Sequence, residues 1–125
     1  MYTLKIEGTF EAAHRIIGHS GKCDRLHGHS WRVEVQVCGT KQDALGMVID
    51  FKYLKEALAG ILNEMDHHYL NELPSFQKQN PTAENLSRVI YEALKAQVHN
   101  WPEVQLRAVT VWESPTASVT YTEET

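Results

Sequence analysis

The sequence predicts an α+β fold in which a four-stranded antiparallel sheet carries two helices on one face. Three observations support it: apolar and polar residues alternate near both ends of the chain, apolar residues recur at three- and four-residue steps in the middle, and turn residues separate these segments. The elements therefore follow the order strand, strand, helix, helix, strand, strand, which is typical of α+β proteins. The 125 residues fit a single domain, 1–125.

Two strands are predicted in the N-terminal third of the chain. Apolar and polar residues alternate from Tyr2, and the pattern continues through Phe10 toward His14. A loop rich in glycine and polar residues follows at 18–25. Alternation then resumes over 31–37, which is the clearest strand pattern in the sequence.

Two helices are predicted in the middle of the chain. The first begins after Asp50, whose carboxylate can accept hydrogen bonds from the free N–H groups of the first turn, and it ends near Met65. The second begins after Thr82, and Glu84 in its first turn complements the helix dipole. Residues 100–102 end this helix.

The last quarter of the chain predicts a hairpin, with strands at 104–113 and 117–121 and a turn at 114–115. Two helices can cover only one face of the sheet, so the other face must meet water or another subunit. Because segment 104–113 is partly apolar on both faces, association of subunits is favoured.

Composition excludes several classes of function. The net charge is −4 and no basic patch stands out, which disfavours a nucleic-acid partner. The first twenty residues contain Lys5, Glu7 and Glu11 and do not resemble a secretory signal, and no apolar run approaches the roughly 20 residues that span a bilayer. Cys23 and Cys38 are therefore expected to be reduced thiols in a cytoplasmic protein.

Histidines cluster in two short segments, with six of the seven at 14–29 and 67–68. His27 and His29 are two residues apart, so in an extended segment both imidazoles leave from the same face. His14 ends the preceding strand and lies beside them if the two strands pair antiparallel. Three histidines with an open fourth position form a catalytic zinc site. The alternative is a set of separate surface histidines.

The cysteines and the remaining histidines are less specific. Cys23 is four residues before His27 and can be a fourth zinc ligand, a buried thiol, or a nucleophile or base. Cys38 is expected to pack within a strand. His19 is expected at the surface or in a substrate loop, and no function is assigned to His99.

Two carboxylates are further candidates. Asp66 adjoins His67 and His68, and a carboxylate beside an imidazole can fix its tautomer as in a general-base dyad; a polar helix end is the alternative. Glu113 ends an apolar run, where a carboxylate needs a partner, such as a ligand with two adjacent N–H groups. Otherwise it faces solvent.

Taken together, five segments resemble the 6-pyruvoyltetrahydropterin synthase family, and within it the 6-carboxy-5,6,7,8-tetrahydropterin synthase branch of queuosine biosynthesis. The resemblance extends from about Phe10 to Tyr121. The segments are Phe10–His14 (FEAAH), Cys23–His29 (CDRLHGH), Asp66–Asn71 (DHHYLN), Asn80–Asn85 (NPTAEN) and Trp112–Glu113.

The resemblance implies the tunnelling fold, in which subunits join their sheets into a barrel with active sites at subunit interfaces, commonly in hexamers built from two trimers. It implies zinc-dependent conversion of 7,8-dihydroneopterin triphosphate into 6-carboxy-5,6,7,8-tetrahydropterin, acetaldehyde and triphosphate. Three alternatives stay open: the pyruvoyl synthase reaction, a folate-pathway relative, and a zinc- and pterin-binding protein without turnover. The folate-pathway relatives generally carry glutamate where this chain has Cys23, which argues against them.

The resemblance also implies roles for individual residues. The implied zinc ligands are His14, His27 and His29. The implied catalytic residues are Cys23, its partner dyad Asp66 and His67, and Glu113, which anchors the pterin ring. Thr82 and Glu84 match the motif that lines the pterin pocket, and the candidates for holding the triphosphate are Lys22, Arg25 and His19.

Overall fold

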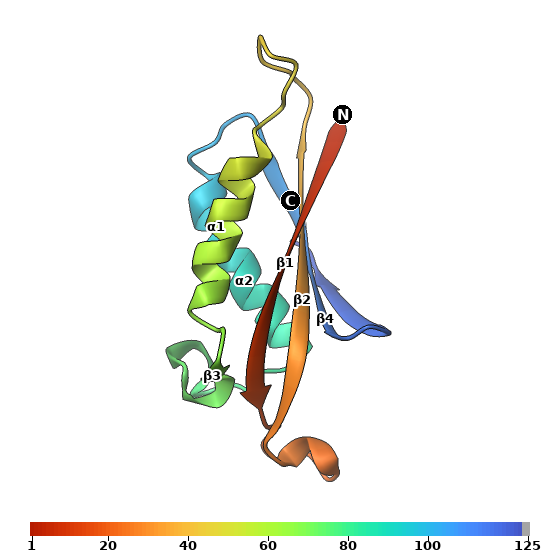
Figure 1. Cartoon of the computed structure of the whole chain (residues 1–125), viewed down its shortest axis with the longest axis vertical. Coiled ribbons are helices and arrows are strands. Elements are labelled where there is room, and N and C mark those ends of the chain that lie inside the picture. Colours follow the sequence, from red (N-terminus) through yellow and green to blue (C-terminus); the bar gives the residue numbers. More distant parts are fainter. Residues whose placement is uncertain (124–125) are drawn as a thin grey trace.

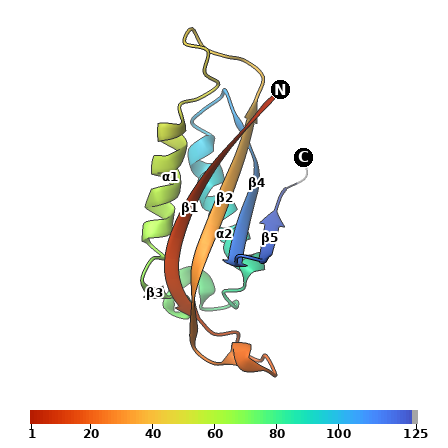
Figure 2. The same cartoon turned by 45° about the vertical axis from the view of Figure 1, so that its right-hand side comes forward.

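The computed structural model describes residues 1–123 and contains five strands in one sheet, in the spatial order β3-β1-β2-β4-β5 (Figures 1 and 2). The predicted four-stranded, wholly antiparallel sheet is wrong in one respect, because β3 is an additional strand that pairs parallel with β1. The element order is therefore ββαβαββ. Two residues are too few to show an alternation pattern, so periodicity could not reveal β3. The strands are β1 (Tyr2–His14), β2 (His27–Gly39), β3 (His68–Tyr69), β4 (Gln105–Ser114) and β5 (Ala117–Tyr121).

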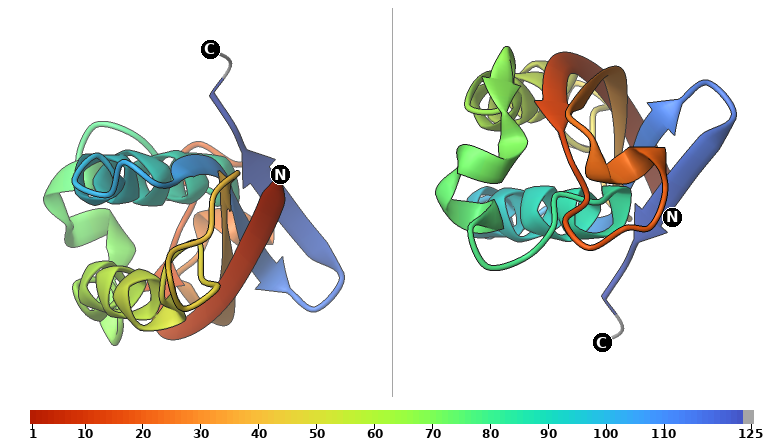
Figure 3. Two further views of the ribbon diagram at one scale, coloured as in Figure 1. Left: turned by 90° about the horizontal axis from the view of Figure 1, so that it is seen from above. Right: turned by 90° about the horizontal axis from the view of Figure 1, so that it is seen from below.

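Two helices, α1 (Phe51–Asn63) and α2 (Ala83–Val98), lie on the same face of the sheet, as predicted (Figure 3). The side chains of Asp50 and Thr82 each accept a hydrogen bond from a backbone N–H in the first turn, which confirms both predicted caps. In the described part of the chain, no helix is both long and apolar enough to cross a membrane. Short 3-10 helices lie in the connections at Lys22–Asp24, Leu70–Glu72 and Pro74–Phe76.

The core lies between the helices and the sheet. The side chains of Trp31 and Val35 in β2, and of Val109 and Val111 in β4, are almost fully buried in this core. Phe10 of β1 stacks on Trp31 with ring centroids 5.8 Å apart. This aromatic pair closes the apolar core at the end of the sheet where the histidines begin.

The opposite face of the sheet is not covered by α1 or α2 (Figure 1). Most of the residues that alternate with the buried ones along β1 and β2 are polar. The guanidinium of Arg32 lies 3.8 Å over the ring of Trp112 and 3.0 Å from the carboxylate of Glu7. Thr110 and Thr120 share a hydrogen bond of 2.6 Å between β4 and β5. Charged and hydroxyl groups therefore share this face with aromatic surface.

Candidate functional site

The three predicted histidine ligands meet at one end of the sheet. His14 pairs with His27, and Ala12 pairs with His29, in the antiparallel β1–β2 ladder. Side chains that lie opposite each other in such a ladder share a face, and His27 and His29 share one by alternation. The centroids of the three rings lie between 4.5 and 5.0 Å from one another. Strand β2 begins at His27, four residues before the predicted segment 31–37. His27 and His29 therefore both lie in the strand, which orients their side chains to one face.

Glu113 of β4 joins this cluster. Its Oε1 lies 3.0 Å from Nε2 of His29 and 3.3 Å from Nε2 of His14. One potential ligand atom from each of His14, His27, His29 and Glu113 lies within 4.8 Å of every other. The structure therefore places the carboxylate expected to hold a pterin ring against the histidines themselves.

Backbone carbonyls determine the tautomers of two of the rings. Nδ1 of His14 lies 2.7 Å from the carbonyl oxygen of Pro81, and Nδ1 of His27 lies 2.6 Å from that of Arg25. A carbonyl only accepts hydrogen bonds, so each Nδ1 carries the hydrogen, as is common for metal-ligating histidines. In the neutral rings both Nε2 atoms are then lone-pair acceptors, although they face each other at 3.0 Å.

Two facing lone pairs require a proton or a cation between them. Burial lowers the pKa of His14, although the hydrogen bond to the Pro81 carbonyl opposes this effect. Burial also lowers the pKa of His29, against the influence of the Glu113 carboxylate. Both shifts favour neutral imidazole over imidazolium. A metal cation therefore suits the site better than a proton.

The third histidine supports the same conclusion. Nε2 of His29 is buried and has no hydrogen-bond partner, because its approach to Glu113 lacks hydrogen-bond geometry. A buried nitrogen of this kind is rare unless it binds something. Imidazole nitrogens with one carboxylate suit divalent transition metals, including zinc, and two ligands of a tetrahedral zinc lie about 3.3 Å apart. The donor set thus fits the predicted metal.

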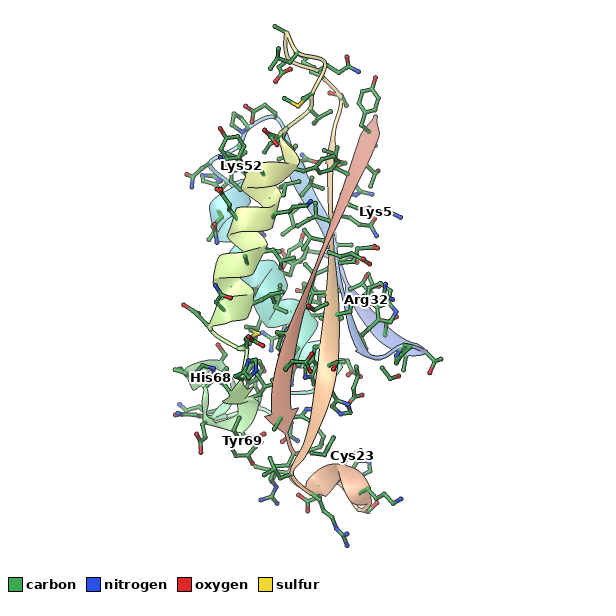
Figure 4. All side chains as sticks on the ribbon, in the orientation of Figure 1. Lys5, Cys23, Arg32, Lys52, His68 and Tyr69 are labelled. Atoms are coloured by element: carbon green, nitrogen blue, oxygen red, sulfur yellow. The ribbon has the colours of Figure 1, made fainter. Side chains whose placement is uncertain are left out.

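A cavity of about 250 Å³ opens beside the cluster. Its lining includes His14 and Glu113 together with three other predicted site residues, Cys23, Thr82 and Glu84. Cys23 lies on the short helix that follows β1, at the lower end of the molecule in Figure 4. The structure therefore brings one predicted metal ligand, the cysteine and the predicted pterin-binding residues around one space.

His67 of the predicted dyad lines a different cavity, of about 540 Å³, together with His29. Asp66 Oδ2 lies 2.9 Å from Nδ1 of His67, and Asp66 Oδ1 accepts a hydrogen bond of 2.8 Å from the backbone N–H of Glu11. That backbone hydrogen bond, and then the one from His67, lower the pKa of Asp66. The neighbouring β3 residue His68 is separated from Cys23 by the ends of β1 and β2 in Figure 4.

The backbone at His67 is unusual. Its φ is +58°, a left-handed conformation that is uncommon for residues other than glycine. Its N–H donates to the carbonyl of Glu11 at 2.6 Å, which holds the turn against β1. Such conformations persist where the surroundings enforce them, and they gather at functional sites.

The remaining predicted residues lie outside the cluster. Cys38 is buried in β2, as its packing role requires. His19 is exposed and accepts a hydrogen bond from the N–H of Gly21, but it also lines the cavity of about 250 Å³ that contains Cys23. Lys22 and Arg25 are exposed on the same loop. Sequence reasoning gave no role to Asn71 and Asn80, although both lie in the segments that carry the family resemblance; their contacts are described below.

Comparison with known proteins identifies the family. A family model described as 6-pyruvoyl tetrahydropterin synthase matches residues 3–124. The 6-carboxy-5,6,7,8-tetrahydropterin synthase of Synechocystis sp. is 41% identical over 100 residues, covering 76% of each chain. The protein of the same name from Haemophilus influenzae is 34% identical over 145 aligned positions, covering 98% of this chain and 100% of the relative.

Solved structures agree with this assignment. Caenorhabditis elegans 6-pyruvoyl tetrahydropterin synthase matches with a TM-score of 0.88 at 29% identity, covering 98% of this chain and 96% of that one. The Plasmodium vivax protein of that name matches with a TM-score of 0.80 at 22% identity, which shows the shared fold alone. From the family model, the relatives and the fold, we conclude that this chain belongs to the 6-pyruvoyl tetrahydropterin synthase family.

Proposed function

We propose that this chain is a zinc-dependent 6-carboxy-5,6,7,8-tetrahydropterin synthase that acts on 7,8-dihydroneopterin triphosphate in queuosine biosynthesis. The observation that carries this proposal is the cavity beside the histidine cluster, because it combines Cys23 and Glu113 with a metal ligand. The relatives that bear this name match the chain at 41% and 34% identity, which supports the same activity.

In this proposal His14, His27 and His29 hold the zinc ion, which supplies Lewis acidity that lowers the pKa of nearby hydroxyl groups. The carbonyls of Pro81 and Arg25 keep the Nε2 atoms of His14 and His27 free for the metal. Because these contacts are made by backbone, the two rings are oriented before any ligand binds.

The cysteine and the dyad move protons. The thiolate of Cys23 removes a proton from the substrate side-chain carbon next to the pterin ring, and His67, oriented by Asp66, exchanges a proton on the other side. Elimination breaks the bond to the triphosphate, which leaves. One water molecule is then consumed as the side-chain carbon–carbon bond breaks, so that the two outer carbons leave as acetaldehyde and the inner carbon stays on the reduced ring as the carboxylate. This reaction is a lyase reaction.

We further propose that each active site combines residues of two subunits. Cys23 and His67 line separate cavities of one chain, so a neighbouring copy can bring its Asp66–His67 dyad to the cysteine. The sheet face left uncovered by the helices is available for the same assembly, as a hexamer built from two trimers. In such an assembly, isolated subunits would lack a complete site.

The activity is tested by incubating purified, zinc-loaded protein with 7,8-dihydroneopterin triphosphate and identifying the products by mass spectrometry. We expect triphosphate, acetaldehyde and 6-carboxy-5,6,7,8-tetrahydropterin. Triphosphate with 6-pyruvoyl tetrahydropterin and no acetaldehyde would identify the pyruvoyl reaction instead. If no triphosphate is released although the pterin binds, the protein is a binder without turnover.

Glu113→Gln separates two roles for that carboxylate. We propose that Glu113 accepts the ring N–H and the 2-amino N–H of the pterin as a bidentate anion. Loss of its charge should then raise KM about 10- to 100-fold, since hydrogen bonds to a charged group contribute about 1.5–3 kcal/mol. Bound zinc, measured by elemental analysis, should not change.

The opposite pattern would contradict the anchoring role. Oε1 of Glu113 lies near Nε2 of His14 and His29, so this carboxylate is also placed to be a fourth zinc ligand. A variant that loses zinc while KM is unchanged would show a closed coordination shell, which is typical of structural zinc. Glu56→Gln, at an exposed position on α1, serves as the charge-matched control.

A further inference from the structure

Two asparagine side chains hold the backbone that continues beyond β1. Oδ1 of Asn71 accepts a hydrogen bond from the N–H of Arg15, and its Nδ2 donates one to the carbonyl of the same residue, both at 3.0 Å. Asn80 repeats the arrangement on Ile17, again with two bonds of 3.0 Å. Each carboxamide thus offers the donor and acceptor that a neighbouring strand would offer.

The other side of this backbone carries the cysteine loop. Between the two held residues, the N–H of Ile16 points the opposite way and donates to the carbonyl of Cys23 at 2.7 Å. The guanidinium of Arg15 binds Asp24 through its side-chain oxygen at 2.7 Å and its carbonyl at 2.9 Å. Segment 15–17 is therefore bound on one side by the two carboxamides and on the other by Cys23 and its neighbour.

The segment that supplies Asn80 also orients the metal ligand. The carbonyl of Asn80 accepts a hydrogen bond of 2.8 Å from Nδ2 of Asn85, in the first turn of α2. The next carbonyl, that of Pro81, lies 2.7 Å from Nδ1 of His14. The two residues Asn80 and Pro81 thus contact both the buried His14 and the backbone of Ile17, in the segment that binds the cysteine loop.

From this geometry we propose that Asn71 and Asn80 are positioning residues that set the place of Cys23 relative to the histidine cluster. The proposal rests on the proposed role of Cys23 in proton transfer. Neither asparagine lines the cavity of about 250 Å³ that contains Cys23, so both act through the backbone of segment 15–17. A thiol displaced by as little as 1 Å can lose about 100-fold in rate.

The test compares Asn71→Ala and Asn80→Ala with Asn63→Ala, a control at an exposed asparagine at the end of α1. Both test variants should lower kcat about 10- to 100-fold, while KM and bound zinc stay near the wild-type values. Alkylation by iodoacetamide, located by mass spectrometry, should become about tenfold faster at Cys23, because the loop opens locally. Buried Cys38 should remain unmodified and thus report on the rest of the fold.

Asn80→Asp provides a variant of the same size. One of its oxygens can still accept from the N–H of Ile17, but the other faces the carbonyl oxygen of Ile17 and cannot donate to it. This variant should change kcat and alkylation in the same direction as Asn80→Ala. Wild-type kcat and wild-type alkylation of Cys23 in these variants would overturn the proposal. Faster alkylation of Cys23 and Cys38 together would also overturn it, because the carboxamides would then support the whole fold.

The alkylation result does not depend on turnover. If wild-type protein releases no triphosphate, the proposed function fails, yet the rate at Cys23 still shows whether Asn71 and Asn80 hold the loop. If wild-type protein is active and the variants keep both its kcat and its alkylation rate at Cys23, only the positioning role fails.

Discussion

Replacing Cys23 by alanine is expected to lower kcat by about 10³-fold or more and to leave the zinc content unchanged. Positioned general bases typically contribute 10²- to 10⁴-fold, and the thiolate is the proposed base for the proton next to the pterin ring. The side chain is only partly buried on the loop after β1, so its loss removes little packing. Turnover of 7,8-dihydroneopterin triphosphate and elemental analysis measure the two quantities.

The other cysteine provides the matched control for this experiment. Cys38 is buried in β2, where it pairs with Thr3 and Gln105, far along the strand from His27. Cys38→Ala should therefore keep wild-type kcat. An active Cys23→Ala enzyme would remove the thiol from the mechanism, whereas zinc loss in that variant would make Cys23 a metal ligand, the alternative that the sequence leaves open.

His27→Ala is expected to lose zinc. One of three imidazole ligands disappears, and Nε2 of His14 loses the partner it faces at 3.0 Å. Affinity should fall by more than the 10- to 100-fold that follows from removing an outer-shell partner of a ligand. Elemental analysis of purified protein, followed by zinc titration of the metal-free form, gives the affinity directly.

Thermal unfolding provides an independent measurement of the same loss. A ligand present at 100 times its Kd stabilises the folded state by about 2.7 kcal/mol, so a chelator should lower the Tm of the wild-type protein. His27→Ala should show the lower Tm without chelator and no further decrease with it. His99→Ala, which changes an exposed histidine after α2, should behave like wild type. Normal zinc binding by His27→Ala would contradict the proposed ligand set.

Local sequence patterns were enough to predict much of the site. Alternation places His27 and His29 on one face, and an antiparallel β1–β2 pair brings the end of the first strand to the start of the second, where His14 meets His27. The helix caps at Asp50 and Thr82 were also predictable, because capping depends on residues within one turn. Each of these features is decided by neighbours in sequence or by one strand pairing.

Other features depend on contacts that no periodicity encodes. Strand β3 is two residues long and pairs parallel with β1 because the turn at His67 hydrogen-bonds to Glu11. Asn71 and Asn80 bind backbone groups that are 56 and 63 residues away in the sequence. Asparagine is common in loops of every kind, so its presence there does not indicate a distant partner. Such contacts depend on where α1 and α2 place the connecting segments.

The sequence by itself determined the α+β class, the two helices and the three imidazoles that share a face, since these follow from residue spacing and the geometry of strands and helices. Only the tertiary structure decided that Glu113 lies against the histidines, that His67 and Cys23 line separate cavities, and that carboxamides hold the cysteine loop. The physical reason is that side-chain contacts between distant segments depend on how helices and sheet pack, and packing is a property of the whole chain.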